Sequence, residues 1–393
     1  MSLINSRFRR LFEDLKRASL ISERSLHSLL REILALRVGQ GKLGISEYFD
    51  FRLYEDDLSE SEKAMFLGRR GQEILYEMAC DEFSTFLGYD KLSQYLILTR
   101  LNLPMPELKA LYAPHTHRAC PVQVIRSEDQ WSSFLAKNES YPLYLKPCHG
   151  NYGRGNAGIK SFRNGELETT RGETLSLTSF VERLSDHSGL GWLVQSTLRP
   201  HPKIREVCGD QISGLRIYTV QTENGPVVHR AVWKINVGGR ISDNFEHGAS
   251  GNMLGAVDLD SGVVTRVVTK VGFDQQVNPL HPVTGAELVG FILPGWDLVK
   301  TLALQATGAF PGLIAQGWDI ALSDVGPVLL EVNLGGDVDL SQHVHRRGFL
   351  DRDYQRHLEE LGVAHLLRGP SLKWRSYHGG ARRGRRAQHW KWW

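Results

Sequence analysis

The feature that most constrains this 393-residue chain is a pair of apolar runs, residues 316–321 and 328–333, that flank the turn-forming sequence Ser-Asp-Val-Gly-Pro at 323–327. Two short apolar runs joined by such a turn predict an antiparallel β-hairpin. Because alternate side chains of a strand leave opposite faces, Glu331 and Asn333 point the same way. Asp319 lies on the partner strand, so the hairpin would gather three oxygen-bearing side chains.

These three side chains favour a metal site. Hard oxygen ligands suit Mg²⁺, which completes its coordination with water and substrate phosphates. The ordinary alternative is a strand that turns its polar side chains to water. However, Glu331 and Asn333 interrupt an otherwise apolar Val-Leu-Leu-x-Val run, where an unpaired buried charge is costly. We therefore expect Asp319, Glu331 and Asn333 to be metal ligands.

The remainder of the chain is expected to mix helices and strands. Leucine and isoleucine recur at three- and four-residue spacing among charges in residues 1–87, which predicts amphipathic helices. Beyond about residue 90, short β-branched runs alternate with turns rich in Gly and Asn, and helical spacing returns at 296–310. Strands and helices without regular βαβ alternation predict an α+β fold.

Composition narrows the functional classes. No apolar run reaches eighteen residues, so no membrane span is expected, and the N-terminus lacks the apolar segment of a secretory signal. The four cysteines are spread singly, which argues against a structural zinc site or a disulfide framework and favours the cytoplasm. The histidines, His343 and His345 included, show no spacing that predicts metal ligands. A net charge of +3 is too small to predict nucleic-acid binding by the body of the protein.

A glycine-rich loop follows Lys146 at the end of a predicted strand. Gly150, Gly153 and Gly155 would let backbone amides approach phosphate oxygens, and Lys146 would add a fixed positive charge. The spacing fits neither a P-loop nor a dinucleotide fingerprint. Taken alone, such a loop is also typical of an ordinary turn.

Other candidate residues lie further along the chain. Arg216 and Lys234 would face the same cleft and stabilise phosphoryl charge. The alternative is a solvent-exposed strand face, and this is what we expect for Arg230. Asp243 and Asn244 precede a Gly-rich stretch and either form a turn or contribute to a substrate cleft.

Taken together and in order, these segments resemble ATP-grasp proteins, most closely the sugar-transfer-associated branch. The resemblance covers about residues 88–350. The matching segments are Asp90-Lys91, Leu103–Pro106, Lys146-Pro147 with the glycine loop, Leu193–Leu198, Leu215–Thr219, Ser242–Phe245, His281–Gly285 with Gly295–Asp297, Gly317–Asp319 and Glu331–Asn333.

The resemblance implies ATP sandwiched between two α+β lobes. Lys146 would contact the phosphates and the adenine side, with Lys91 as a companion lysine. Gln195 and Leu198 would contact adenine, and the predicted metal ligands would hold one or two Mg²⁺ ions between phosphates. Many ligases of the family place an arginine where this chain has Gly317.

Because of that departure, charge stabilisation would fall to Arg216, helped by Lys234. The implied activity is ligation, in which a carboxylate is activated as an acyl phosphate and then attacked by an amine. Two alternatives stay open: a kinase acting on a small molecule or glycan, and a non-catalytic ATP-binding module of a surface-glycan or peptide-modifying system. Arg346 and Arg347 would either meet an acidic substrate or form a solvated charge pair.

The resemblance also suggests a division of the chain. The expected segments are a helical N-terminal region at 1–87, a pre-domain linker at 88–140, a small lobe with the glycine-rich loop at 141–200, a catalytic lobe with the metal site at 201–350, and a C-terminal helix with a tail at 351–393. No acidic residue follows Glu360, while basic residues and tryptophans accumulate. Such a tail either binds an acidic or anionic partner or is a solubilising extension.

Overall fold

The N-terminal part of the protein is helical, as predicted. The computed structural model describes residues 2–116, 118–137, 141–149, 155–185, 190–238 and 242–368. The helices before the first strand are α1 (Ser2–Ser22), α2 (Leu26–Val38), α3 (Ile45–Asp50), α4 (Glu60–Lys63), α5 (Arg69–Ala79), α6 (Glu82–Tyr89) and α7 (Lys91–Arg100).

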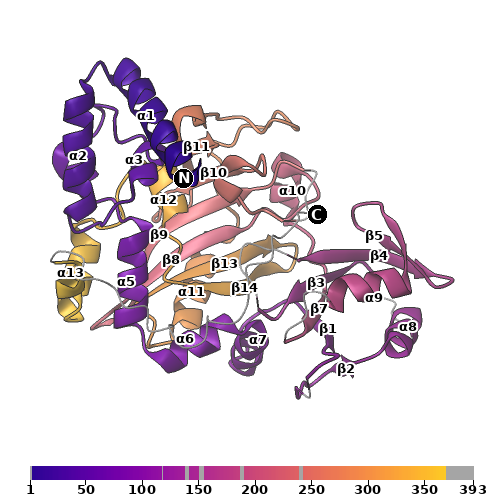
Figure 1. The fold of residues 1–393 in the computed structure, drawn as a ribbon. Coiled ribbons are helices and arrows are strands. Elements are labelled where there is room, and N and C mark those ends of the chain that lie inside the picture. Colours follow the sequence, from indigo (N-terminus) through magenta and orange to yellow (C-terminus); the bar gives the residue numbers. More distant parts are fainter. Residues whose placement is uncertain are drawn as a thin grey trace.

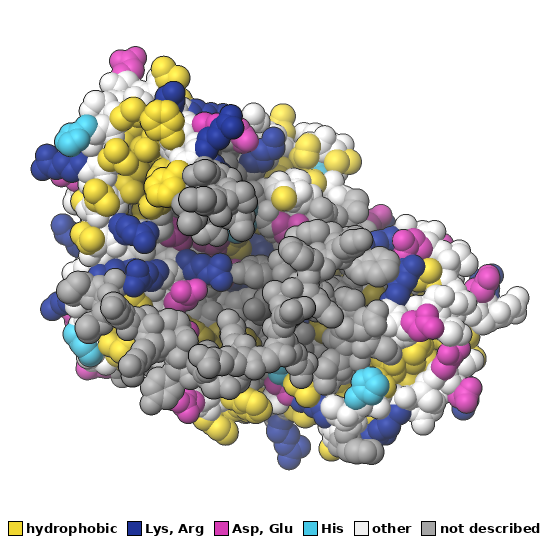
Figure 2. Space-filling view, in the orientation of Figure 1, with side chains coloured by type: hydrophobic (Ala, Val, Ile, Leu, Met, Phe, Trp, Pro, Cys, Tyr) yellow, Lys and Arg dark blue, Asp and Glu magenta, His cyan; other side chains and the backbone are white. Residues whose placement is uncertain are grey.

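Local signals start these helices where the sequence offers a cap. Ser25 accepts a hydrogen bond from Ser28 N at the start of α2, and Asp90 accepts one from Leu92 N at the start of α7. The inner faces of α1, α2 and α3 pack together around buried Leu29 and Tyr48. Their outer faces keep large hydrophobic side chains exposed, among them Phe8, Phe12, Leu20, Leu34 and Val38 (Figure 2).

Two seven-stranded sheets follow and form the body of the molecule (Figure 1). The first sheet has the order β2-β1-β7-β3-β4-β5-β6, and only its β1–β2 pair is parallel. Its strands are β1 (Leu108–Tyr112), β2 (Gln123–Ile125), β3 (Leu143–Pro147), β4 (Ala157–Arg163), β5 (Glu166–Thr169), β6 (Thr174–Ser176) and β7 (Trp192–Ser196). The helices α8 (Glu128–Lys137) and α9 (Leu177–Ser185) pack against it around buried Trp131.

The second sheet is antiparallel throughout, with the order β12-β11-β10-β9-β8-β13-β14. Its strands are β8 (Leu215–Thr222), β9 (Gly225–Ile235), β10 (Met253–Val257), β11 (Val264–Thr269), β12 (Gln276–Val277), β13 (Ala315–Ser323) and β14 (Gly326–Leu334). The predicted hairpin is β13–β14. The short helix α10 (Pro202–Cys208) lies between the two sheets in the chain.

Both faces of the second sheet are covered, so its central strands are apolar on both sides. Ile217 and Trp318 face α11 (Trp296–Thr307), whereas Tyr218 and Val232 face α12 (Asp339–His345) and α13 (Arg352–Glu360). The predicted α+β fold with a helical N-terminal region is confirmed. No helix among the described residues is both long and apolar enough to cross a membrane.

The sequence prediction missed one central strand. β10 is buried along its whole length, although the sequence around it suggested a Gly-rich loop. Gly255 lies on this strand, and a Cβ there would sit 3.2 Å from Val264 and 3.3 Å from Trp233. Glycine is therefore used for close packing here rather than for a turn. The tail at 369–393 lies outside the described residues.

Candidate active site

A cavity of about 1290 Å³ opens between the two sheets. The chain crosses from one sheet to the other at its edge, where Pro200 forms an isolated bridge with Ser323 of β13. Nine of the predicted site residues contribute to the cavity wall: Lys91, Lys146, Gln195, Leu198, Lys234, Asp243, Asn244, Asp319 and Glu331. Residues separated by up to 240 positions in sequence therefore share one site.

Three charged residues stand in a row across neighbouring strands of the second sheet. Asp319 on β13 is the direct partner of Arg216 on β8 and of Glu331 on β14. Asn333 lies two residues beyond Glu331, and its Nδ2 donates to Asp319 Oδ2 at 3.2 Å. The hairpin thus brings together the three side chains that the sequence analysis singled out.

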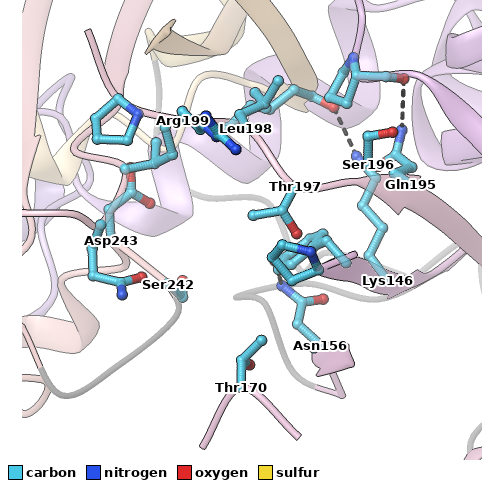
Figure 3. A pocket seen from close by; sticks show the side chains of 18 of the residues that line it. Lys146, Asn156, Thr170, Gln195, Ser196, Thr197, Leu198, Arg199, Ser242 and Asp243 are labelled. Atoms are coloured by element: carbon cyan, nitrogen blue, oxygen red, sulfur yellow. Dashed lines mark hydrogen bonds between the residues drawn. The ribbon is translucent and has the colours of Figure 1, made fainter. Parts of the chain in front are cut away.

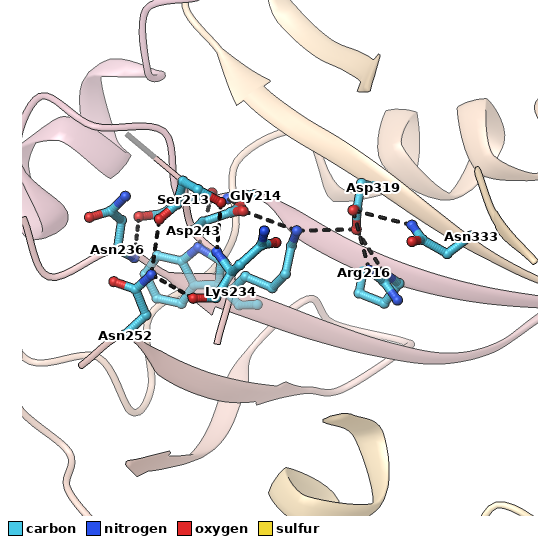
Figure 4. Close-up of polar contacts among 12 residues, drawn as sticks. Ser213, Gly214, Arg216, Lys234, Asn236, Asp243, Asn252, Asp319 and Asn333 are labelled. Carbon is cyan, nitrogen blue, oxygen red and sulfur yellow. Dashed lines mark hydrogen bonds and ion pairs between the residues drawn. The ribbon is translucent and has the colours of Figure 1, made fainter. Parts of the chain in front are cut away.

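Asp319 is buried and neutralised by two cations (Figure 4). Its Oδ1 accepts a hydrogen bond from Arg216 Nε at 2.7 Å and lies 3.2 Å from Lys234 Nζ. Burial raises the pKa of Asp319, but the charges of Arg216 and Lys234 outweigh this effect and lower the pKa to about 2. The carboxylate is therefore held ionised at neutral pH.

Lys234 joins this pair to the predicted substrate residue Asp243. Lys234 Nζ donates to Asp243 Oδ1 at 3.0 Å, and Gly214 N donates to Asp243 Oδ2 at 2.8 Å (Figure 4). Asp243 is buried, so its carboxylate anchors Lys234 while Asn244 beside it lies at the cavity. Two cations and two carboxylates form one charge-balanced network, of which Lys234, Asp243 and Asp319 belong to the cavity wall.

Arg216 lies behind Asp319 and is not part of the cavity wall. Its Nη1 donates to the carbonyl of Gly336 at 3.1 Å, in addition to the bonds to Asp319. A Cβ on Gly317 would come within 2.5 Å of that carbonyl and 3.0 Å of the Arg216 side chain. The packing of Arg216 thus leaves room only for glycine at position 317, where the resemblance implies an arginine in many ligases.

Two lysines flank Glu331 from the first sheet and from α7. Lys91 Nζ lies 3.4 Å from Glu331 Oε2, and Lys146 Nζ donates to the carbonyl of Leu330 at 2.9 Å. Lys146 is buried at the end of β3, and burial lowers its pKa to about 8 despite the opposing charge of Glu331. Two neighbouring ammonium groups on the cavity wall attract a polyanion such as a nucleotide.

The part of the wall beside Lys146 comes from β7 and the segment that follows it (Figure 3). Gln195 is buried beside β3 and donates to the carbonyl of Pro106 at 3.4 Å. Leu198 adds an apolar side chain to the cavity. An amide beside an apolar surface is suited to a planar heterocycle.

Of the remaining predicted residues, Asn333 and Gly155 do not contribute to the cavity wall. Gly150 and Gly153 lie outside the described residues. Gly155 has a φ of 83°, which glycine adopts readily, and packs against Trp192 rather than at the cavity. Cys148 is buried, and burial raises the pKa of its thiol to about 12, so the thiol is structural and not a nucleophile.

The arginines outside the site are engaged elsewhere. Arg230 is buried and pairs with Asp351 at 2.8 Å, so its expected place on a solvent-exposed strand face is wrong. Arg346 pairs with Asp57, and Arg347 lies 3.1 Å from Asp351. Neither Arg346 nor Arg347 contributes to the cavity wall.

Several cavity residues carried no sequence signal. Tyr144 lies beside Lys146 on β3, and its hydroxyl accepts a hydrogen bond from Asn156 Nδ2. Arg171 and Arg199 also contribute to the wall from segments far apart in the chain. Only the pairing of strands brings these residues together, so local sequence patterns could not have found them.

A family model for sugar-transfer associated ATP-grasp proteins matches residues 82–358. The chain belongs to this family. The match confirms the resemblance found in the sequence, and the two-sheet body with its interposed cavity is the fold of a sugar-transfer-associated ATP-grasp protein. No curated protein matches the chain.

Solved structures similar to this ATP-grasp protein are distant. The VanG D-Ala:D-Ser ligase from Enterococcus faecalis is 14% identical, with 73% of this chain and 62% of that chain covered and a TM-score of 0.38. The D-alanine–D-alanine ligase from Bacillus anthracis is 11% identical (76% and 72% covered, TM-score 0.38). The L-amino acid ligase from Bacillus licheniformis is 14% identical (72% and 49% covered, TM-score 0.37). The protein therefore spans less than two thirds of the first of these structures and about half of the third.

Proposed function

We propose that this protein is an ATP- and Mg²⁺-dependent ligase that joins a carboxylate to an amine through an acyl phosphate. The observation that carries the proposal is the arrangement of Asp319, Glu331 and Asn333 on one hairpin. Asp319 and Glu331 line the cavity together with Lys91 and Lys146. Oxygen ligands beside ammonium groups suit a magnesium-bound polyphosphate.

The donor set fits magnesium. Asp319 and Glu331 are direct cross-strand partners, and the amide of Asn333 uses Nδ2 towards Asp319, which leaves its Oδ1 as an oxygen donor. When bound, the metal would neutralise phosphate oxygens in the way usual for phosphoryl transfer. Arg216 and Lys234 would position Asp319 for this role, because both cations fix its carboxylate from behind.

The chain's own side chains would align the reactants. A carboxylate oxygen of the substrate attacks the γ-phosphorus of ATP, and the bond to the leaving ADP oxygen breaks. Lys146 would stabilise the negative charge on the phosphates, and Gln195 with Leu198 would hold the base. The amine then attacks the acyl carbon, the C–O bond to phosphate breaks, and the nitrogen releases a proton to form the amide.

A hydroxylamine trap tests this proposal without knowledge of the natural amine. The purified full-length protein is incubated with Mg–ATP, hydroxylamine and a library of amino acids, short peptides and uronic acids. ADP and phosphate release and hydroxamate mass are measured. A hydroxamate formed in equal amount with ADP supports acyl-phosphate chemistry, and Glu331→Gln should abolish it. A stable phosphorylated product instead would place the protein among kinases, and ADP release with neither product would contradict ligation.

A further inference from the structure

A second cluster of ligand-type side chains lies apart from the predicted magnesium site. His247 belongs to the short 3₁₀ turn Glu246–Gly248, while Asp339 and His343 are four residues apart on α12 and so share one face of that helix. One ligand atom from each of the three residues lies within 4.8 Å of the others. Two imidazoles and a carboxylate thus converge from segments about 90 residues apart.

His343 provides an observation that the fold alone does not explain. The side chain is buried, and its Nδ1 finds no hydrogen-bond partner among the described residues. Its ring packs 4.6 Å from the ring of Phe51, so one side of the imidazole is apolar. A buried polar nitrogen without a partner is costly, and such groups in native proteins commonly mark a ligand or a bound ion.

His247 reaches the cluster through an unusual backbone conformation. Its φ is 52°, in the left-handed region that residues other than glycine seldom adopt. Such strain persists where the surrounding structure requires it and often accompanies function. His247 is exposed, so its side chain has freedom to move towards the two residues of α12.

We propose that His247, Asp339 and His343 form a zinc site. Two imidazoles with one carboxylate match the nitrogen and oxygen ligands of zinc, whereas magnesium prefers oxygen alone. In a tetrahedral site with bonds of ~2.0–2.1 Å, ligand atoms stand about 3.4 Å apart. The present spread of up to 4.8 Å is wider than this, so the three ligands would draw together on binding, and water would complete the coordination.

The site would fasten a loop beside the cavity. Residues 242–252 connect Asp243, which anchors Lys234, to β10. α12 packs against β9, β10 and β11, and it contacts the N-terminal helical part through Phe51 (Figure 1). Zinc would therefore tie the loop that carries Asp243 to the sheet and to the N-terminal helices. This inference does not depend on the proposed ligase activity.

Zinc titration of the full-length protein tests the proposal. The protein is stripped with chelator, returned to buffer with excess Mg²⁺ to fill oxygen sites, and titrated with Zn²⁺ by calorimetry; Co²⁺ absorption reports coordination geometry. The wild type should bind one more equivalent than His247→Ala and Asp339→Asn. Each substitution removes a direct ligand. Zinc affinity at that site should therefore fall by more than the roughly 10–100-fold seen when a residue that only supports a ligand is lost. His27→Ala, which removes an exposed histidine of α2, should behave as the wild type does.

Hydrogen exchange of the loop provides the second measurement. Zinc should slow exchange at residues 242–252 in the wild type and leave it unchanged in His247→Ala. His247 is exposed, so its replacement is expected to leave the fold intact, which circular dichroism checks. Equal zinc stoichiometry and affinity in the wild type and His247→Ala would overturn the site. Zinc binding without slower exchange of the loop would overturn its fastening role.

Discussion

We expect the ionised carboxylate of Asp319 to make the free energy of unfolding fall as the pH is lowered. We expect Asp319→Asn to remove this pH dependence. Arg216 and Lys234 outweigh burial and hold the pKa of Asp319 at about 2, below its ordinary value of 3.8. A depressed pKa of the folded state stabilises the protein above the unfolded pKa, and this stabilisation is lost as the pH falls through the folded pKa. A pKa lowered by 3.8 − 2 = 1.8 corresponds to about 2 kcal/mol of unfolding free energy. About 1 kcal/mol of this is already lost at pH 3.

Asp319→Asn removes the titrating group. At pH 7 we expect the variant to be less stable by about 3–5 kcal/mol, because two buried cations lose a shared anion. The difference should shrink by about 1 kcal/mol between pH 7 and pH 3, since the wild type loses the same charge over that range. Urea unfolding followed by tryptophan fluorescence at several pH values measures both quantities.

The matched control is Asp324→Asn, which replaces an exposed carboxylate on the turn of the same hairpin. The unfolding free energy of this variant should equal that of the wild type at every pH. A difference between Asp319→Asn and the wild type that stays constant from pH 7 to pH 3 would refute the reasoning. So would a stability loss at pH 7 no larger than that of the control.

Four further predictions concern the cavity and its support. Lys146→Ala should weaken ATP binding by about 10–100-fold, as loss of a charged hydrogen bond does. Replacement of the exposed Lys160 by Ala should leave ATP affinity unchanged. Equal affinities of the two variants by calorimetry would contradict this. Because burial lowers the pKa of Lys146 to about 8, ATP affinity of the wild type should fall between pH 7 and pH 9, and a flat profile would count against its role. Glu331→Gln should abolish ADP release with an unchanged near-ultraviolet spectrum, and full turnover would exclude it as a metal ligand. Gly214→Ala should cost about 1–3 kcal/mol of unfolding free energy, because the new Cβ would lie 2.6 Å from Asp243 Oδ2, and an unaltered urea midpoint would disprove that clash.

Local patterns in the sequence were sufficient for the hairpin at the centre of the site. Apolar runs around a turn predicted β13 and β14, and strand alternation placed Glu331 and Asn333 together. The pairing of Arg216 with Asp319 could not be predicted in the same way. β8 and β13 are about 100 residues apart, and the local sequence of a strand does not indicate which strands become its neighbours.

The histidine cluster escaped prediction for a related reason. Asp339 and His343 are four residues apart on α12, but their proposed partner His247 comes from a loop before β10, so no local pattern contains the whole set. β10 was missed because glycine in a tightly packed strand resembles glycine in a turn. The roles of individual site residues and the division of the chain into segments stay predictions, which the substitutions above address.

The arrangement of the strands along the chain has a consequence for biosynthesis. All strands of the first sheet lie between Leu108 and Ser196, and its two ends meet where Ser196 N donates to the carbonyl of Glu107 at 2.9 Å. The ribosome therefore completes this sheet as one contiguous unit. The second sheet must wait, because β8 has an unpaired edge until β13 is synthesised about 90 residues later. A nascent chain stalled before Ala315 would expose that edge, and chaperone binding or aggregation should be greatest at this stage of translation.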